Sequence, residues 1–93
     1  MPYFHKLPSR FSGDGWKAKV FDKESGLEPP HVTLLRKTLK WRFDLRDLKF
    51  MDSDPPTRMV PKILIELLEA DIARLREEWD KIHPKNPVGG NNG

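Results

Sequence analysis

The chain contains no cysteine, which excludes disulfide bonds and cysteine-based metal sites. It has no apolar run near the roughly 20 residues that a membrane-spanning helix needs, and its N-terminus lacks the apolar core of a signal peptide. A glycine-rich phosphate loop, a nucleophile elbow and a zinc-protease helix motif are also missing. These absences predict a cytoplasmic protein, and we expect neither a cofactor nor a bound metal.

Proline and glycine are plentiful, with 9 and 6 among 93 residues. They gather at the two ends and in two internal loops, which predicts one domain at residues 1–85 and a flexible tail at residues 86–93. Charge is uneven, because residues 1–49 carry 11 Lys/Arg against 6 Asp/Glu, whereas residues 50–93 carry 6 against 8. The first half is therefore expected to present a basic surface.

Three segments of the first half are predicted to be strands. They are residues 16–22, 31–36 and 39–44. The first and third alternate apolar and polar side chains with the period of two of a half-buried strand, and the second is rich in Val, Thr and Leu. The apolar positions expected to face the core are Trp16, Ala18, Val20, Leu39, Trp41 and Phe43. Turns are expected at residues 23–26 and 37–38, and the aromatic-rich lead-in is a candidate edge strand.

One long helical pattern fills most of the second half. Pro61 suits a first helical turn, and apolar residues then recur with a period of 3.6 until Pro84 ends the pattern. The stripe consists of Leu64, Ile65, Leu68, Ile72, Leu75, Trp79 and Ile82. The predicted fold class is therefore α+β: a small antiparallel sheet of about three strands, with an optional fourth at the N-terminus, packed on one long C-terminal helix.

A family resemblance is carried by three groups of residues. Residues 28–32 are Glu-Pro-Pro-His-Val, residues 40–44 are Lys-Trp-Arg-Phe-Asp, and Leu75 and Trp79 follow in the helix. The chain thus resembles a small prokaryotic family known as a domain of unknown function, with the motif Glu-Pro-Pro-His-Val-His. That family is regarded as the toxin-like half of a type II toxin–antitoxin pair, so the resemblance implies a small protein partner encoded nearby. Thr33 replaces the second histidine of the motif.

His31 is the candidate catalytic residue, because two prolines deliver it to the start of a strand on a stiff approach. Imidazole is the usual proton carrier near neutral pH, and Glu28 or Asp44 is available as an orienting carboxylate. The favoured alternative is structural: the ring covers the strand end and bonds a loop carbonyl, since a lone histidine is weak evidence of catalysis. No second ligand lies at a metal-binding spacing from His31.

Basic residues form the candidate site for nucleic acid or a protein partner. Side chains alternate between the two faces of a strand, and cations at the positions turned away from the helix attract phosphate groups or an acidic partner. The predicted set is Arg10, Lys17, Lys19, Lys37, Lys40 and Arg42. Binding of single-stranded RNA also requires aromatic side chains on that face, and we expect only Phe21 there. The alternative is an ordinary solvated face of an antiparallel sheet.

Three functions are consistent with these patterns. The first, which we predict, is a small interaction protein, the toxin-like component of a toxin–antitoxin module, that binds a small protein partner and RNA through the basic sheet face. The second is a small RNA-cleaving enzyme that uses His31. The third is a non-catalytic module that pairs with a partner, or with a second copy as a homodimer, through an open sheet edge.

Overall fold

The structure is a computed structural model that describes residues 2–22 and 28–89. The elements of this part are β1 (Tyr3–His5), α1 (Ser9–Ser12), β2 (Lys17–Val20), β3 (His31–Arg36), β4 (Leu39–Asp44), the 3-10 helix η1 (Thr57–Met59), α2 (Lys62–Ala70) and α3 (Ile72–Ile82). The strands form one antiparallel sheet in the order β1-β2-β3-β4. The α+β class and the optional N-terminal strand are therefore confirmed, while the turn predicted at residues 23–26 lies outside the described residues.

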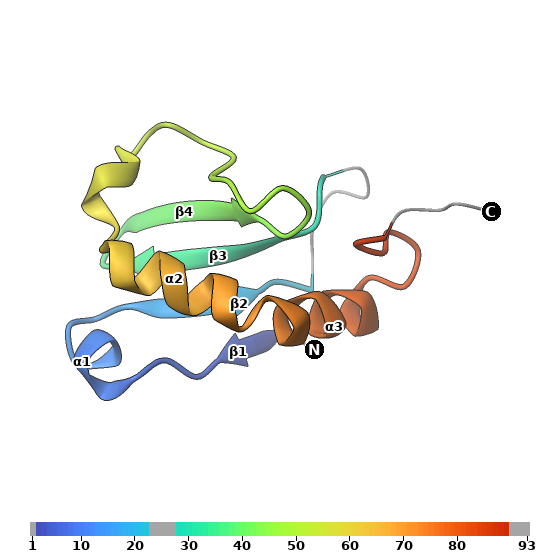
Figure 1. Cartoon of the computed structure of the whole chain (residues 1–93), viewed down its shortest axis with the longest axis horizontal. Coiled ribbons are helices and arrows are strands. Elements are labelled where there is room, and N and C mark those ends of the chain that lie inside the picture. Colours follow the sequence, from blue (N-terminus) through green and yellow to red (C-terminus); the bar gives the residue numbers. More distant parts are fainter. Residues whose placement is uncertain (1, 23–27, 90–93) are drawn as a thin grey trace.

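Helices and sheet form two layers. Figure 1 shows α2 and α3 following one another in a line across one face of the sheet, with β3 and β4 joined by a tight reversal. The reversal falls at residues 37–38, as predicted, and Lys37 adopts a φ of 57° there although it is not glycine. The other face of the sheet carries exposed side chains, so one face packs on helices and the other meets solvent.

The hydrophobic core lies between the two layers. Val32 and Leu34 on β3, with Trp41 and Phe43 on β4, are at most 1% exposed. Burial of one large apolar side chain contributes about 1.5–3 kcal/mol, so these alternating positions fix which face of the sheet turns inward. The helices contribute Leu64, Leu68, Leu75 and Trp79. Helix α1, which the sequence analysis missed, adds the buried ring of Phe11 at the edge of this core.

The prediction of one long C-terminal helix is wrong, because α2 and α3 are separated at Asp71. Asp71 has φ −97° and ψ 14°, although its N–H still donates to the Leu67 carbonyl at 3.0 Å. Its side chain accepts a 2.8 Å hydrogen bond from Nε2 of His5 on β1, and Nδ1 of His5 lies 2.8 Å from the Tyr3 hydroxyl. The helix is thus interrupted at the residue whose side chain binds β1, a strand far away in sequence. The spacing of the apolar residues continues from α2 into α3.

The chain after α3 returns to the domain. The Trp79 indole N–H donates to the Asn86 carbonyl at 2.7 Å, and the Asn86 amide donates to the Glu28 carbonyl at 2.8 Å. Arg46 Nε donates to the Val88 carbonyl at 2.7 Å. Residues 86–89 are the described part of the predicted tail, and Asn86 hydrogen-bonds the segment before β3. Residues 90–93 lie outside the described part. No described helix is long and apolar enough to cross a membrane.

Candidate functional site

The face of the sheet turned away from α2 and α3, which we term the open face, is defined by the strand register. Phe4 pairs with Lys19, Lys19 with Thr33, and Thr33 with Arg42. Residues directly opposite one another in antiparallel strands point to the same face, so these four side chains form one row across the sheet. The neighbouring row is Lys17, Leu35 and Lys40.

Most of the predicted basic residues meet on this open face. Those on it are Lys17, Lys19, Lys40 and Arg42. Lys37 lies in the reversal between β3 and β4 and lines a hollow together with Lys17. Arg10 lies instead on α1, where its guanidinium sits 4.9 Å from the ring centre of Phe11, a core residue. The structure therefore groups five of the six predicted cations around one surface and leaves Arg10 apart from them.

Two aromatic rings lie beside Lys19 on the open face. The Lys19 ammonium lies 4.8 Å from the ring centre of Phe4 and 4.4 Å from that of Phe21. Phe4 is 62% exposed, which is unusual for so large an apolar side chain. Phe21 was identified from its position in the sequence, whereas Phe4 was missed because three residues of β1 are too few to establish an alternating pattern. The open face therefore has aromatic surface as well as charge.

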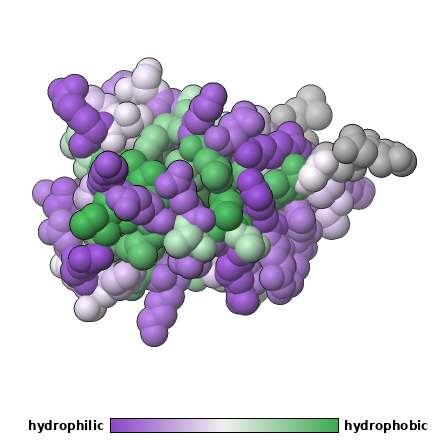
Figure 2. Space-filling view, in the orientation of Figure 1, coloured by the Kyte–Doolittle hydropathy of each residue, from purple (hydrophilic) through white to green (hydrophobic). Residues whose placement is uncertain are grey.

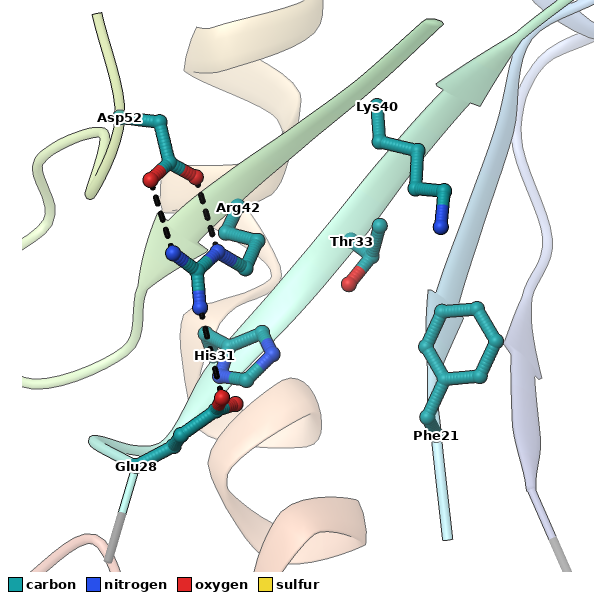
Figure 3. A pocket seen from close by; sticks show the side chains of 7 residues that line it. All are labelled: Phe21, Glu28, His31, Thr33, Lys40, Arg42 and Asp52. Atoms are coloured by element: carbon teal, nitrogen blue, oxygen red, sulfur yellow. Dashed lines mark hydrogen bonds and ion pairs between the residues drawn. The ribbon is translucent and has the colours of Figure 1, made fainter. Parts of the chain in front are cut away.

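A pocket of about 410 Å³ opens on the same face, at the end where β3 begins. Its lining consists of Phe21, Glu28, His31, Thr33, Lys40, Arg42 and Asp52. In Figure 3, the Lys40 side chain extends toward the Phe21 ring, and the Arg42 guanidinium lies on the other side, between Asp52 and Glu28. The pocket thus has an aromatic and basic wall facing a wall that contains two carboxylates.

Arg42 is not an isolated cation, which corrects its place in the predicted basic patch. Its Nε and one terminal nitrogen donate to the two oxygens of Asp52 at 2.8 and 2.7 Å, and its other terminal nitrogen lies 3.7 Å from Glu28. The hydrogen bond and the positive charge of Arg42 hold the pKa of Asp52 below its ordinary value, against a smaller opposing effect of burial. Asp52 therefore stays ionised in the pocket wall.

His31 occupies a structural environment within the pocket wall. It is 2% exposed, its ring centre lies 5.4 Å from that of Trp79 on α3, and its Nδ1 lies 2.8 Å from the Pro29 carbonyl. Because a carbonyl only accepts, Nδ1 carries the proton of this bond. Asp44, one of the two predicted orienting carboxylates, lies opposite His31 in the register, but its Oδ1 accepts the amides of Arg46 and Asp47. This environment matches the structural interpretation of His31 and offers no exposed catalytic imidazole.

Pairing through an open sheet edge was one alternative for the function, and no bound metal was expected. The outer edge of β4 is hydrogen-bonded by the following segment, with Asp44 N donating to the Lys49 carbonyl at 2.7 Å and Met51 N donating to the Arg42 carbonyl at 2.8 Å. The opposite edge belongs to β1, which has only 3 residues. Within residues 2–22 and 28–89, no group of three or more His, Asp or Glu side chains is arranged to hold a metal ion.

The fold and this surface together describe an α+β domain with an open, basic and aromatic sheet face. Comparison with protein-family models, curated proteins and solved structures finds no match to the chain. The resemblance to a toxin-like family therefore stays a prediction, and the geometry of the open face is the remaining indication of a function.

Proposed function

We propose that the protein binds single-stranded RNA across the open face of its sheet and performs no catalysis there. The observation that carries this proposal is the Lys19 ammonium between the rings of Phe4 and Phe21 on a solvent-facing sheet surface. Proteins that bind single strands combine aromatic rings, on which bases stack, with cations that neutralise the backbone phosphates. Both parts are present within one row of the sheet and its immediate neighbours.

The two rings flank a single lysine. Phe4 lies directly opposite Lys19 in the register, Phe21 follows Lys19 by two residues, just after the end of β2, and the Lys19 ammonium lies 4.8 and 4.4 Å from the two ring centres. An extended single strand can therefore place one base on each ring and the phosphate between them at Lys19. Lys17 and Lys40, which share the neighbouring row, offer further positive charge for adjacent phosphates.

The test is fluorescence anisotropy of a labelled single-stranded RNA of about eight nucleotides. The logarithm of the binding constant should fall with the logarithm of salt concentration between about 50 and 200 mM, with a slope of about −0.7 for each phosphate neutralised. If Lys17, Lys19 and Lys40 each neutralise one phosphate, the wild-type slope should be about −2. Each Lys→Ala change should make the slope less steep by about 0.7.

Lys62→Ala is the matched control, because Lys62 is an exposed lysine on α2, in the layer on the other side of the sheet. Its affinity and salt slope should equal those of the wild type. Absence of RNA binding at about 50 mM salt, or a Lys17/Lys19/Lys40→Ala triple variant that binds as the wild type does, would refute the proposal. Cleavage of the RNA that is abolished by His31→Ala would favour the enzyme instead.

A second candidate function is the toxin-like role with a small protein partner, and we propose the α2 side of the molecule as its contact. Met59 and Ile63 are 46% and 50% exposed there, and Figure 2 shows apolar residues gathered over this side among hydrophilic ones. Contiguous exposed apolar patches that are rimmed by polar residues are typical of protein-binding surfaces. Co-purification with the product of the neighbouring gene is expected to be lost in an Ile63→Glu variant but kept in Lys17→Glu, which places the same side chain on the open face. No co-purification by the wild type would contradict this role.

A further inference from the structure

A hollow of about 440 Å³ lies beside Phe4, at the end of the sheet where β1 stops and β2 begins. Figure 1 shows α1 at this end of the sheet. The pocket that contains His31 lies at the opposite end, because β3 runs antiparallel to β2. Lys6 and Lys17 line the hollow, and none of the described residues that line it carries a carboxylate.

The two lysines come together just beyond the strand pairing. The register of β1 and β2 ends with His5 opposite Ala18, and Lys6 and Lys17 are the next residues beyond this pair. Like charges opposite one another in neighbouring strands lower stability. Within residues 2–22 and 28–89, neither lysine forms an ion pair. The stability of the fold therefore does not account for the two charges, whereas an anion between them would remove their repulsion.

Two carboxylates of neighbouring segments are engaged with other partners. Asp71 accepts the 2.8 Å hydrogen bond from Nε2 of His5, which also lines the hollow. Asp14, in the loop between α1 and β2, accepts a hydrogen bond from Arg36 at 3.3 Å. The hydroxyl of Ser12 lines the hollow as a further donor. The hollow thus offers two ammonium groups and a hydroxyl to a ligand that accepts hydrogen bonds.

We infer that this hollow holds a terminal phosphate of the bound RNA, an inference that rests on the proposed RNA binding. A phosphate monoester carries a charge of about −1.5 to −2 at neutral pH, whereas a phosphate within the nucleic-acid chain carries about −1. Two lysines with no carboxylate beside them match the more highly charged group. The ligand class is therefore single-stranded RNA that ends in a phosphate.

Rings and lysines alternate along the line that leads to the hollow. The proposed contact for two bases and the phosphate between them consists of Phe21, Lys19 and Phe4. Lys17 precedes Lys19 by two residues on β2 and so lies on the same face, and the hollow borders Phe4 itself. The phosphate beyond the base on Phe4 therefore reaches the hollow. The RNA ends there, because Ser12 of α1 bounds the hollow.

The experiment compares three unlabelled RNAs of one sequence, about eight nucleotides long, as competitors of a labelled RNA. The first has a hydroxyl group at both ends, the second carries a 5′-phosphate and the third carries a 3′-phosphate. The wild type should bind one of the two phosphorylated RNAs at least about fivefold more tightly than the other two RNAs, because that end places a doubly charged group between two cations. Lys6→Ala should reduce this preference to about twofold or less.

Lys62→Ala is the control, because it removes the same charge from an exposed lysine on α2, and it should retain the full preference. Thermal unfolding of each variant verifies that the fold is intact. Equal affinity for all three RNAs overturns the terminal phosphate site, as does an equal gain from a phosphate at either end, which added charge alone would give. An unchanged preference in Lys6→Ala overturns it too. RNA binding stands in each of these cases, whereas failure of the wild type to bind any of the RNAs refutes the proposed function itself.

Discussion

The two faces of the sheet are built by neighbouring residues of the same strands, yet they differ in composition and in exposure. On β4, Trp41 is 1% exposed against the helices, while Lys40 and Arg42 on either side of it point to the open face. The covered face is apolar throughout its centre. The open face combines lysines, two phenylalanines and a carboxylate-bound arginine. Since stability requires only one apolar face, the composition of the other is free to reflect binding.

The largest expected difference between the faces is in stability. Trp41→Ala should lower the free energy of unfolding by about 3–5 kcal/mol, because it leaves a cavity between the layers and removes the indole that donates to the Pro56 carbonyl. Lys40→Ala, one residue away, should change it by less than about 0.5 kcal/mol. Urea unfolding followed by the fluorescence of the remaining tryptophans measures both.

Equal effects of the two substitutions would show that the open face is buried in some larger contact. If Trp41→Ala yields no folded protein, Trp41→Phe offers a smaller change of the same kind. It should still destabilise more than Lys40→Ala, because a cavity and an unpaired carbonyl remain.

The sequence was sufficient to predict which side chains lie on each face of the sheet. It was insufficient to predict the contacts that strand residues make with distant loops and helices. Alternation placed Lys40, Trp41 and Arg42 on the correct faces, because burial of one face determines the register of a strand. It did not reveal that Asp52, in a loop ten residues later, binds Arg42, because the spacing of apolar residues predicts helices and strands but not the conformation of a loop. The break at Asp71 was missed for a related reason, because its partner, His5, is 66 residues away.

The Arg42–Asp52 pair gives the next largest effect and tests whether the acidic wall is held in place. Asp52→Asn should lower the free energy of unfolding by up to about 1 kcal/mol at neutral pH, the range of a partly exposed ion pair. The pKa of Asp52 is lowered in the folded state, so its contribution is complete above the unfolded pKa of about 3.9 and is lost as pH falls through the folded value.

The difference between wild type and Asp52→Asn should therefore disappear in acid, as measured by urea unfolding from neutral pH to below about pH 3. Asp47→Asn is the control, because Asp47 is an exposed carboxylate in the turn after β4. It should show a smaller change in the free energy of unfolding at neutral pH. A difference for Asp52→Asn that persists at the lowest pH would mean that something other than the ionised pair stabilises this wall.

Phe4 is expected to have the smallest effect on stability, and this makes it the clearest test of the open face. Because its side chain is 62% exposed, Phe4→Ala should change the free energy of unfolding by no more than about 0.5 kcal/mol. If a base stacks on the ring, the same substitution should weaken RNA binding by about fivefold or more. Phe4→Leu, which keeps apolar bulk but removes the ring, should also weaken binding, whereas Phe4→Tyr should not. Normal binding by Phe4→Ala, together with weak binding by the lysine variants, would reduce the open face to a surface that attracts RNA through charge alone.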